Sequence, residues 1–100
     1  MPQKVTVHVD REIQDLVPTF LANRHRDLAT LKQALAAQNF DAMRIIGHNL
    51  KGVGGGYGFH EITAIGALME RAGKEAQAAT LAELIQRYAD YLEAVEVEYL

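Results

Sequence analysis

The residues best suited to chemistry are His48 and Lys51, which stand three positions apart in the segment GHNLKGVGGGYGF, residues 47–59. On a helix this spacing puts both side chains on one face. A neutral imidazole is a good nucleophile, and the ordinary pKa of a histidine side chain is about 6.5. A lysine beside it supplies a mobile cation for an anion that arrives at the ring. If the approach to the ring is open, such a pair suits phosphoryl transfer through a phosphohistidine, because positioning and a nearby cation do most of the work of that reaction.

The same segment contains six glycines, which strengthen a signal that a histidine and a lysine alone would leave weak. A glycine inside a helix costs about 1 kcal/mol relative to alanine, so something should compensate for so many. Gly52 and Gly55 follow His48 by one and two turns on the same face, where their missing side chains would clear the approach to the ring. Arg44, one turn before His48, shares this face. We expect Gly52, Gly55 and Arg44 to contact a docking partner.

A helix must present these residues to solvent. At about 100° per residue, the apolar positions of the segment fall within an arc of about 140°, with Asn49 as the one polar member. His48 lies outside the arc, which argues against a packed core histidine and leaves an idle surface histidine as the simpler alternative. We expect the helix to begin at a cap formed by Asn39 or Asp41 and to continue to Tyr57. The positions in the arc are Ala42, Ile45, Ile46, Asn49, Leu50, Val53 and Tyr57.

The N-terminal part of the chain reads as an arm followed by helices. KVTVHV alternates like a strand but is short and isolated, so residues 4–9 are expected to form an extended arm. Asp10 is expected to cap a first short helix, and Pro18 fits the first turn of a second helix or a kink. The polar turn NRHR, residues 23–26, is expected to interrupt this second stretch.

Two further helical patterns complete the chain, one over residues 59–76 and one over residues 81–99. Thr80 and Glu83 are placed as a capping box for the last helix. Tyr88, Tyr91 and Tyr99 recur at helical spacing, which favours packing over a cofactor site. Short connections between amphipathic helices favour antiparallel neighbours. The expected fold class is all-α, an antiparallel up-down four-helix bundle with a short N-terminal helix or arm, in a single domain over residues 1–100.

Composition narrows the range of functions. The net charge is -3 and no basic run occurs, so nothing marks a nucleic-acid binder. The chain has no cysteine, which excludes disulfides and thiolate metal sites. His8, His25 and His60 show no ligand spacing with one another or with His48 and are expected on the surface. The apolar runs are too short to span a membrane, and the start lacks a signal-peptide core. We expect a soluble, cytoplasmic protein without a metal or cofactor.

Other motif interpretations fit less well. GVGGGYG suggests a phosphate-binding loop, but a Walker loop follows a strand and ends in Gly, Lys and Ser or Thr, whereas Lys51 precedes the glycines. A dinucleotide-binding fingerprint fails because the strand is missing. His60 and Glu61 begin a zincin-like motif, yet Ala64 stands where its second histidine would be. Arg24 and Arg26 are expected on a solvated helix face.

The stretch HNLKGVGGGYGFHEITAIGALMERA resembles the core motif of histidine-containing phosphotransfer (Hpt) domains. Their pattern is His, any residue, Leu, Lys, Gly, several small residues, Gly and an apolar residue, followed later by a leucine-rich helix with a Glu. The GYGF portion also looks like the phosphotransfer domain of chemotaxis kinases, and a weaker likeness extends upstream. The chain departs from the pattern at Val53 and Gly54, where members often have small hydroxyl residues or alanine. The matching residues are His48, Leu50, Lys51, Gly52, Gly58, Phe59 and Glu70.

The resemblance implies that His48 exchanges a phosphoryl group with the aspartate of a response-regulator receiver domain, supplied by that receiver or by a sensor histidine kinase. Lys51 would steady the group and Gly52 would leave room for it. Any Mg²⁺ would belong to the receiver, and the chain would have no ATP site or autokinase activity. We expect a monomer, with a starting Met and length that fit a free-standing protein. The alternative function is a helical interaction scaffold that docks to a receiver or kinase without being phosphorylated.

Overall fold

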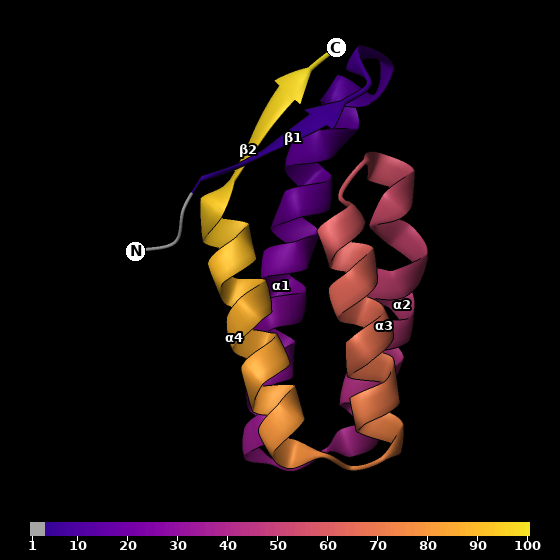
Figure 1. The fold of residues 1–100 in the computed structure, drawn as a ribbon, viewed down its shortest axis with the longest axis vertical. Helices are drawn as coiled ribbons and strands as arrows, with labels where there is room; N and C mark the ends of the chain where they lie inside the picture. Colours follow the sequence, from indigo (N-terminus) through magenta and orange to yellow (C-terminus); the bar gives the residue numbers. More distant parts are fainter. Residues whose placement is uncertain (1–3) are drawn as a thin grey trace.

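Four long helices form the body of the molecule in the computed structural model, which describes residues 4–100 (Figure 1). The expectation of a mostly helical chain with four helices is confirmed. The α1–α2 and α3–α4 connections lie at one end of the molecule, and the α2–α3 connection lies at the other (Figure 1). The helices are α1 (Val17–Ala36), α2 (Phe40–Val53), α3 (His60–Lys74) and α4 (Ala78–Ala94).

Local sequence signals begin two of the helical segments where we expected. Asp10 caps η1, a 3-10 helix over Arg11–Leu16, and its side chain accepts a hydrogen bond from the backbone N–H of Glu12 at 2.9 Å. Asn39 is the cap of α2, because its side-chain oxygen accepts from the N–H of Ala42 at 3.1 Å. Each cap satisfies a backbone donor that the first turn of a helix leaves without a partner.

Two expectations about helix boundaries are wrong. The polar NRHR turn does not interrupt α1, which is continuous over 20 residues. Arg24 stabilises it there, because its guanidinium pairs with Asp27 at 2.8 Å and lies 4.8 Å from the centroid of the Phe20 ring. The proposed capping box of Thr80 and Glu83 does not form either. Helix α4 begins at Ala78, so both residues already lie inside it.

The two ends of the described chain pair as strands. β1 (Val5–Val9) and β2 (Val95–Tyr99) form a parallel two-stranded sheet in which Val5 is opposite Val95 and Val9 is opposite Tyr99. The expected unpaired arm is therefore wrong, as is the expected continuation of the last helix to Tyr99. The first three residues of the chain lie outside the described residues. VEVEY alternates apolar and charged residues, as a strand with one half-buried face requires.

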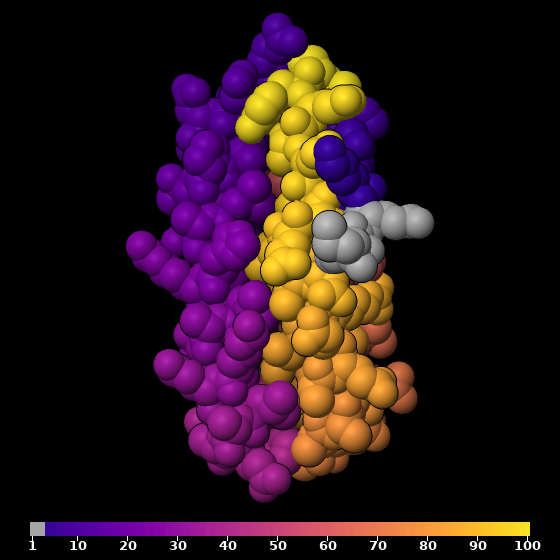
Figure 2. Space-filling view, turned by 90° about the vertical axis from the view of Figure 1, so that its left-hand side faces the viewer, coloured from indigo at the N-terminus to yellow at the C-terminus, as the bar shows by residue number. Residues whose placement is uncertain are grey.

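A hydrophobic core runs the length of the bundle, and Figure 2 shows α1 and α4 side by side along one face of it. Tyr88 and Tyr91 are buried in this core, as their spacing predicted, whereas Tyr99 is half-buried on β2. Phe20 stacks on Tyr57 at 4.2 Å and on Phe59 at 5.2 Å between ring centroids. This aromatic stack ties α1 to the segment that joins α2 to α3.

Candidate functional site

His48 and Lys51 lie together on the exposed face of α2. The His48 side chain is 63% exposed and that of Lys51 is 44% exposed. Both residues belong to a helix whose first turn is capped by Asn39 and which buries its opposite side against the core. An imidazole placed in this way is open to a second protein, and the flexible lysine can follow a group bound to the ring.

A third residue completes the site from a different helix. Glu70 of α3 lies with Oε2 2.8 Å from His48 Nδ1 and with Oε1 2.6 Å from Lys51 Nζ. Its side chain is only 12% exposed. Glu70 matches the Hpt pattern in the sequence, but the pattern alone predicts no contact for it. The residue is 22 positions from His48, and no local spacing connects the two.

Electrostatics determine which nitrogen of His48 is available. The hydrogen bonds from Lys51 and then from His48 lower the pKa of Glu70 from its ordinary value of 4.5 to about 2. Glu70 is therefore ionised near neutral pH, and an ionised carboxylate only accepts hydrogen bonds. Nδ1 must then carry the ring proton of neutral His48. The lone pair lies on Nε2, which makes no hydrogen bond within residues 4–100.

Glycines lie where α2 and α3 pack against each other beside this cluster. A Cβ built on Gly47 would lie 2.5 Å from the backbone nitrogen of Glu70 and 2.9 Å from the carbonyl oxygen of Gly66. Gly47 is consequently buried, together with Met43 and Leu50. The apolar arc expected for α2 is therefore rotated relative to the face that is buried. Ile45 was a member of that arc but is 46% exposed. A wheel based on apolar side chains gives no weight to a glycine, although a glycine can mark the tightest contact.

The glycine-rich stretch after Lys51 is not a continuous helix, so the expected extension of α2 to Tyr57 is wrong. α2 ends at Val53, and η2, a 3-10 helix over Gly55–Tyr57, follows the Gly54 C-cap. The N–H of Gly55 donates to Thr63 Oγ1 at 2.8 Å. Gly58 then turns the chain with a φ of 89°, which a residue with a Cβ rarely adopts.

These boundaries separate the two glycines expected beside His48. Gly52 is exposed on α2, and a Cβ built there would meet nothing within 4 Å. Gly55 is half-buried beyond the end of the helix, so it does not share the helical face of His48. Gly54 allows a close approach to α3, because a Cβ there would lie 2.7 Å from the Thr63 nitrogen. Gly56 has open space around it and serves no such contact.

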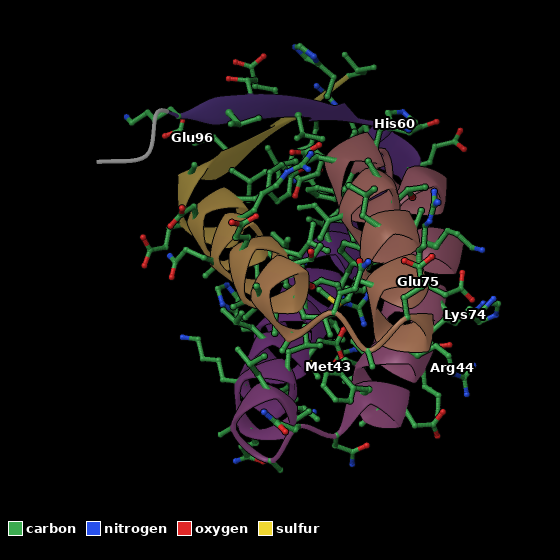
Figure 3. The ribbon with its side chains drawn as sticks, turned by 60° about the horizontal axis from the view of Figure 1, so that its bottom comes forward. Met43, Arg44, His60, Lys74, Glu75 and Glu96 are labelled. Atoms are coloured by element: carbon green, nitrogen blue, oxygen red, sulfur yellow. The ribbon has the colours of Figure 1, made fainter. Side chains whose placement is uncertain are left out.

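Arg44 lies one turn before His48 but makes its contacts elsewhere. Its guanidinium pairs with Asp41 at 2.7 Å, and its backbone packs against Gly73. Figure 3 shows Arg44 near Lys74, at the end of α3. Arg44 therefore does not contact the His48, Lys51 and Glu70 cluster in this structure.

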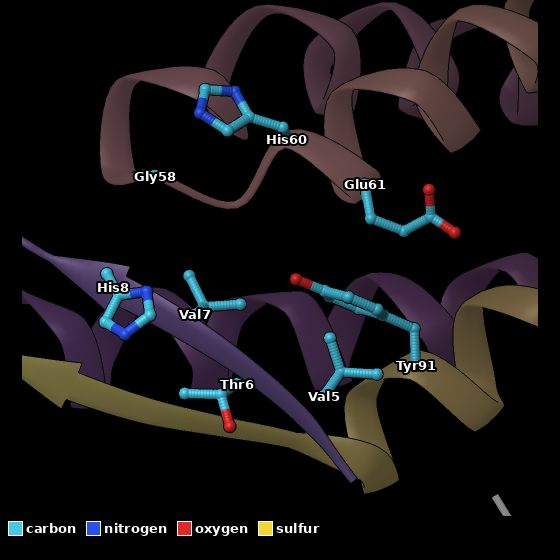
Figure 4. Close-up of a pocket in the computed structure, with 8 residues that line it drawn as sticks. All are labelled: Val5, Thr6, Val7, His8, Gly58, His60, Glu61 and Tyr91. Atoms are coloured by element: carbon cyan, nitrogen blue, oxygen red, sulfur yellow. The ribbon is translucent and has the colours of Figure 1, made fainter. Parts of the chain in front are cut away.

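A groove lies away from this cluster. It has a volume of about 360 Å³ and is bounded by β1, the start of α3 and Tyr91 (Figure 4). His8, His60 and Glu61 line it, and His8 is hydrogen-bonded to Glu98 at 3.1 Å. Within residues 4–100 no group of three or more potential ligand side chains could hold a metal ion. The His48, Lys51 and Glu70 cluster lies outside this groove, with His48 and Lys51 on an exposed surface.

Comparison with known proteins gives one match. The family model described as Hpt domain matches residues 15–98, which include α1 to α4 and all three residues of the cluster. Searches of curated proteins and of solved structures found no match. Among the described helices, none is both long and apolar enough to cross a membrane.

Proposed function

Because the chain belongs to the Hpt domain family, we propose that His48 accepts a phosphoryl group and exchanges it with the aspartate of a response-regulator receiver domain. Membership of the family implies histidine phosphotransfer in two-component signalling, and Hpt domains carry phosphoryl groups without kinase activity of their own. The observation that carries the assignment to His48 is the bridge formed by Glu70, whose carboxylate contacts His48 Nδ1 with one oxygen and Lys51 Nζ with the other. It gives one exposed histidine a fixed orientation and a neighbouring cation.

The bridge supports a specific transfer step. Glu70 holds the Nδ1 proton, so the Nε2 lone pair of His48 attacks the phosphorus of the aspartyl phosphate on the receiver. A nitrogen–phosphorus bond forms as the bond between phosphorus and the aspartate oxygen breaks, and the aspartate leaves as a carboxylate. Lys51 lies on the same face and offsets the negative charge of the transferred group. The reverse transfer uses the same contacts.

The surface around His48 suits a transient protein partner. Gly52 leaves open space one turn after the histidine, and Ile45 presents an exposed apolar side chain one turn before it. We propose that a receiver or a sensor histidine kinase docks here, with Gly52 at the contact and with Gly55 and Arg44 at its edge. The receiver's own Mg²⁺ and aspartate would complete the site. We also propose that the protein is monomeric and cytoplasmic, that residues 1–100 form a single domain, and that α1 to α4 pack as an antiparallel up-down bundle.

Incubation with a phosphorylated receiver domain tests this function. We expect acid-labile, base-stable phosphate on the native chain and none on the His48→Gln variant, which should still bind the receiver. His25→Gln is the matched control, because His25 is an exposed histidine on α1, outside the cluster. Binding of the native chain without phosphate transfer, over a panel of receivers, would contradict the proposal and favour the non-phosphorylated scaffold.

A further inference from the structure

α2 and α3 approach each other closely at the backbone of the residues that form the bridge. A Cβ built on Gly66 would lie 2.7 Å from the carbonyl oxygen of Gly47 and would collide with the backbone nitrogen of Lys51. On the other side, a Cβ on Gly47 would lie 2.5 Å from the backbone nitrogen of Glu70. Each glycine therefore touches the main chain of one residue whose side chain belongs to the bridge.

In this arrangement, the distance between α2 and α3 determines whether the Glu70 carboxylate can contact His48 and Lys51. The Glu70 side chain extends from α3 to His48 and Lys51 on α2, so its length has to match the distance between the two backbones. Carbon atoms in ordinary contact need about 3.5 Å, so a methyl group at position 66 would force the backbones apart by roughly 1 Å. A hydrogen bond of 2.8 Å would then stretch beyond useful length.

We propose that Gly66, together with Gly47, is a positioning residue for the phosphoryl-acceptor site. The pair holds α3 so close to α2 that the Glu70 carboxylate reaches both His48 and Lys51 and keeps the proton on Nδ1. The consequence for transfer rests on the proposed function of His48, whereas the consequence for the histidine tautomer does not.

A third glycine on the same side of α3 provides the control. Gly73 lies two turns after Gly66, and a Cβ built on it would be 2.9 Å from the backbone nitrogen of Arg44. Gly73→Ala therefore also forces a conflict between the backbones of α3 and α2, although its Cβ would approach α2 less closely than that of Gly66. Arg44 takes no part in the bridge, because its side chain pairs with Asp41. A purely structural role of the glycines predicts the same result for Gly66→Ala and Gly73→Ala.

The first readout is the tautomer of neutral His48, measured from its imidazole ¹⁵N chemical shifts in the full chain. We expect the native protein and Gly73→Ala to hold the proton on Nδ1. Gly66→Ala should populate both tautomers. Equal spectra for the two folded variants would overturn the inference. If Gly66→Ala does not fold, Gly47→Ala replaces it, and failure of both to fold while Gly73→Ala folds would also overturn it in favour of a structural role.

The second readout is the rate of transfer from a phosphorylated receiver domain. We expect Gly66→Ala to slow transfer about tenfold or more, since a misplacement of roughly 1 Å at an active site can slow a reaction up to about 100-fold. In a Glu70→Gln background the same substitution should have no further effect, because Gly66 acts through Glu70. An undiminished effect in that background would contradict the inference. If the native chain accepts no phosphate at all, the proposed function fails. The tautomer measurement still decides whether Gly66 positions Glu70 against His48.

Discussion

The carboxylate of Glu70 lies 2.8 Å from Nδ1 of His48, although the two residues are 22 positions apart and on different helices. The same carboxylate holds Lys51 at 2.6 Å. One nearly buried side chain thus orients the exposed imidazole and anchors the cation beside it. This relationship leads to predictions about rate, stability and the position of the phosphoryl group.

Replacing Glu70 should slow phosphotransfer without weakening docking. Glu70→Gln keeps the shape of the side chain but removes the charge that fixes the Nδ1 proton and holds Lys51. We expect the initial rate of transfer from a phosphorylated receiver to fall about tenfold. Affinity for the receiver, measured by titration calorimetry, should be unchanged. The control is Glu75→Gln, because Glu75 is an exposed residue near the end of α3 that pairs with Arg71 at 3.5 Å. Native rates in Glu70→Gln would show that the bridge has no role in transfer.

The lowered pKa of Glu70 predicts a pH-dependent contribution to stability. Its pKa is about 2 in the folded chain, against an ordinary value of 4.5, because Lys51 and His48 donate to the carboxylate. A lowered pKa contributes stability that is complete above the ordinary value and is lost as the pH falls towards the folded value. In urea unfolding, the difference between native and Glu70→Gln should therefore be largest above pH 4.5 and shrink towards pH 2. A difference that stays constant over this range would contradict the assignment.

Replacing Gly52 with alanine should raise the stability of the protein but slow phosphotransfer. A Cβ at this position meets nothing within 4 Å, so Gly52→Ala should fold and gain about 1 kcal/mol from helix propensity. The new methyl group stands one turn from His48, where a partner must approach, so transfer should slow. Chemical denaturation and transfer assays measure the two effects. Gly56→Ala provides a comparison, because Gly56 also faces open space but lies beyond the end of α2. Transfer by Gly52→Ala at the native rate would remove Gly52 from the docking surface.

Gly58 should be required for its backbone conformation. Its φ is 89°, and a Cβ there would also lie 3.2 Å from the carbonyl oxygen of His8. The left-handed region costs a residue with a Cβ about 1–2 kcal/mol, so Gly58→Ala should lower the free energy of unfolding by at least this amount. Gly56→Ala, at a position without a positive φ, should not. Thermal and urea unfolding of both variants decide the point, and equal stability would refute the role of the turn.

The sequence predicted the helix starts at Asp10 and Asn39, but not the one at Ala78, where the expected capping box of Thr80 and Glu83 does not form. It failed at the two ends because strand pairing is not a local property. Val95 and Tyr99 are four residues apart, which also suits a helix. The partner strand that resolves this ambiguity lies 90 positions earlier in the chain. Local sequence patterns do not show that two segments separated by 90 positions will pair as strands.

The site was also predictable only in part, because local spacing shows which residues share a helix face but not which residues of another helix they contact. The spacing of His48 and Lys51 placed both on one exposed face, and Gly52 was correctly expected beside them. The predicted rotation of α2 was wrong because Gly47, which contributes no apolar side chain, is in close contact with the backbone of α3. The bridge to Glu70 depends on that contact and so could not follow from periodicity.

Long-range ¹H–¹⁵N and ³¹P NMR on the phosphorylated chain would locate the phosphoryl group and so test the role of the bridge in the intact protein. We expect a single phosphohistidine at position 48, with phosphorus coupled to Nε2 and the proton retained on Nδ1. Phosphate on Nδ1 of His48 would contradict the role of Glu70. Phosphate on His8, His25 or His60 would contradict the identification of the site itself.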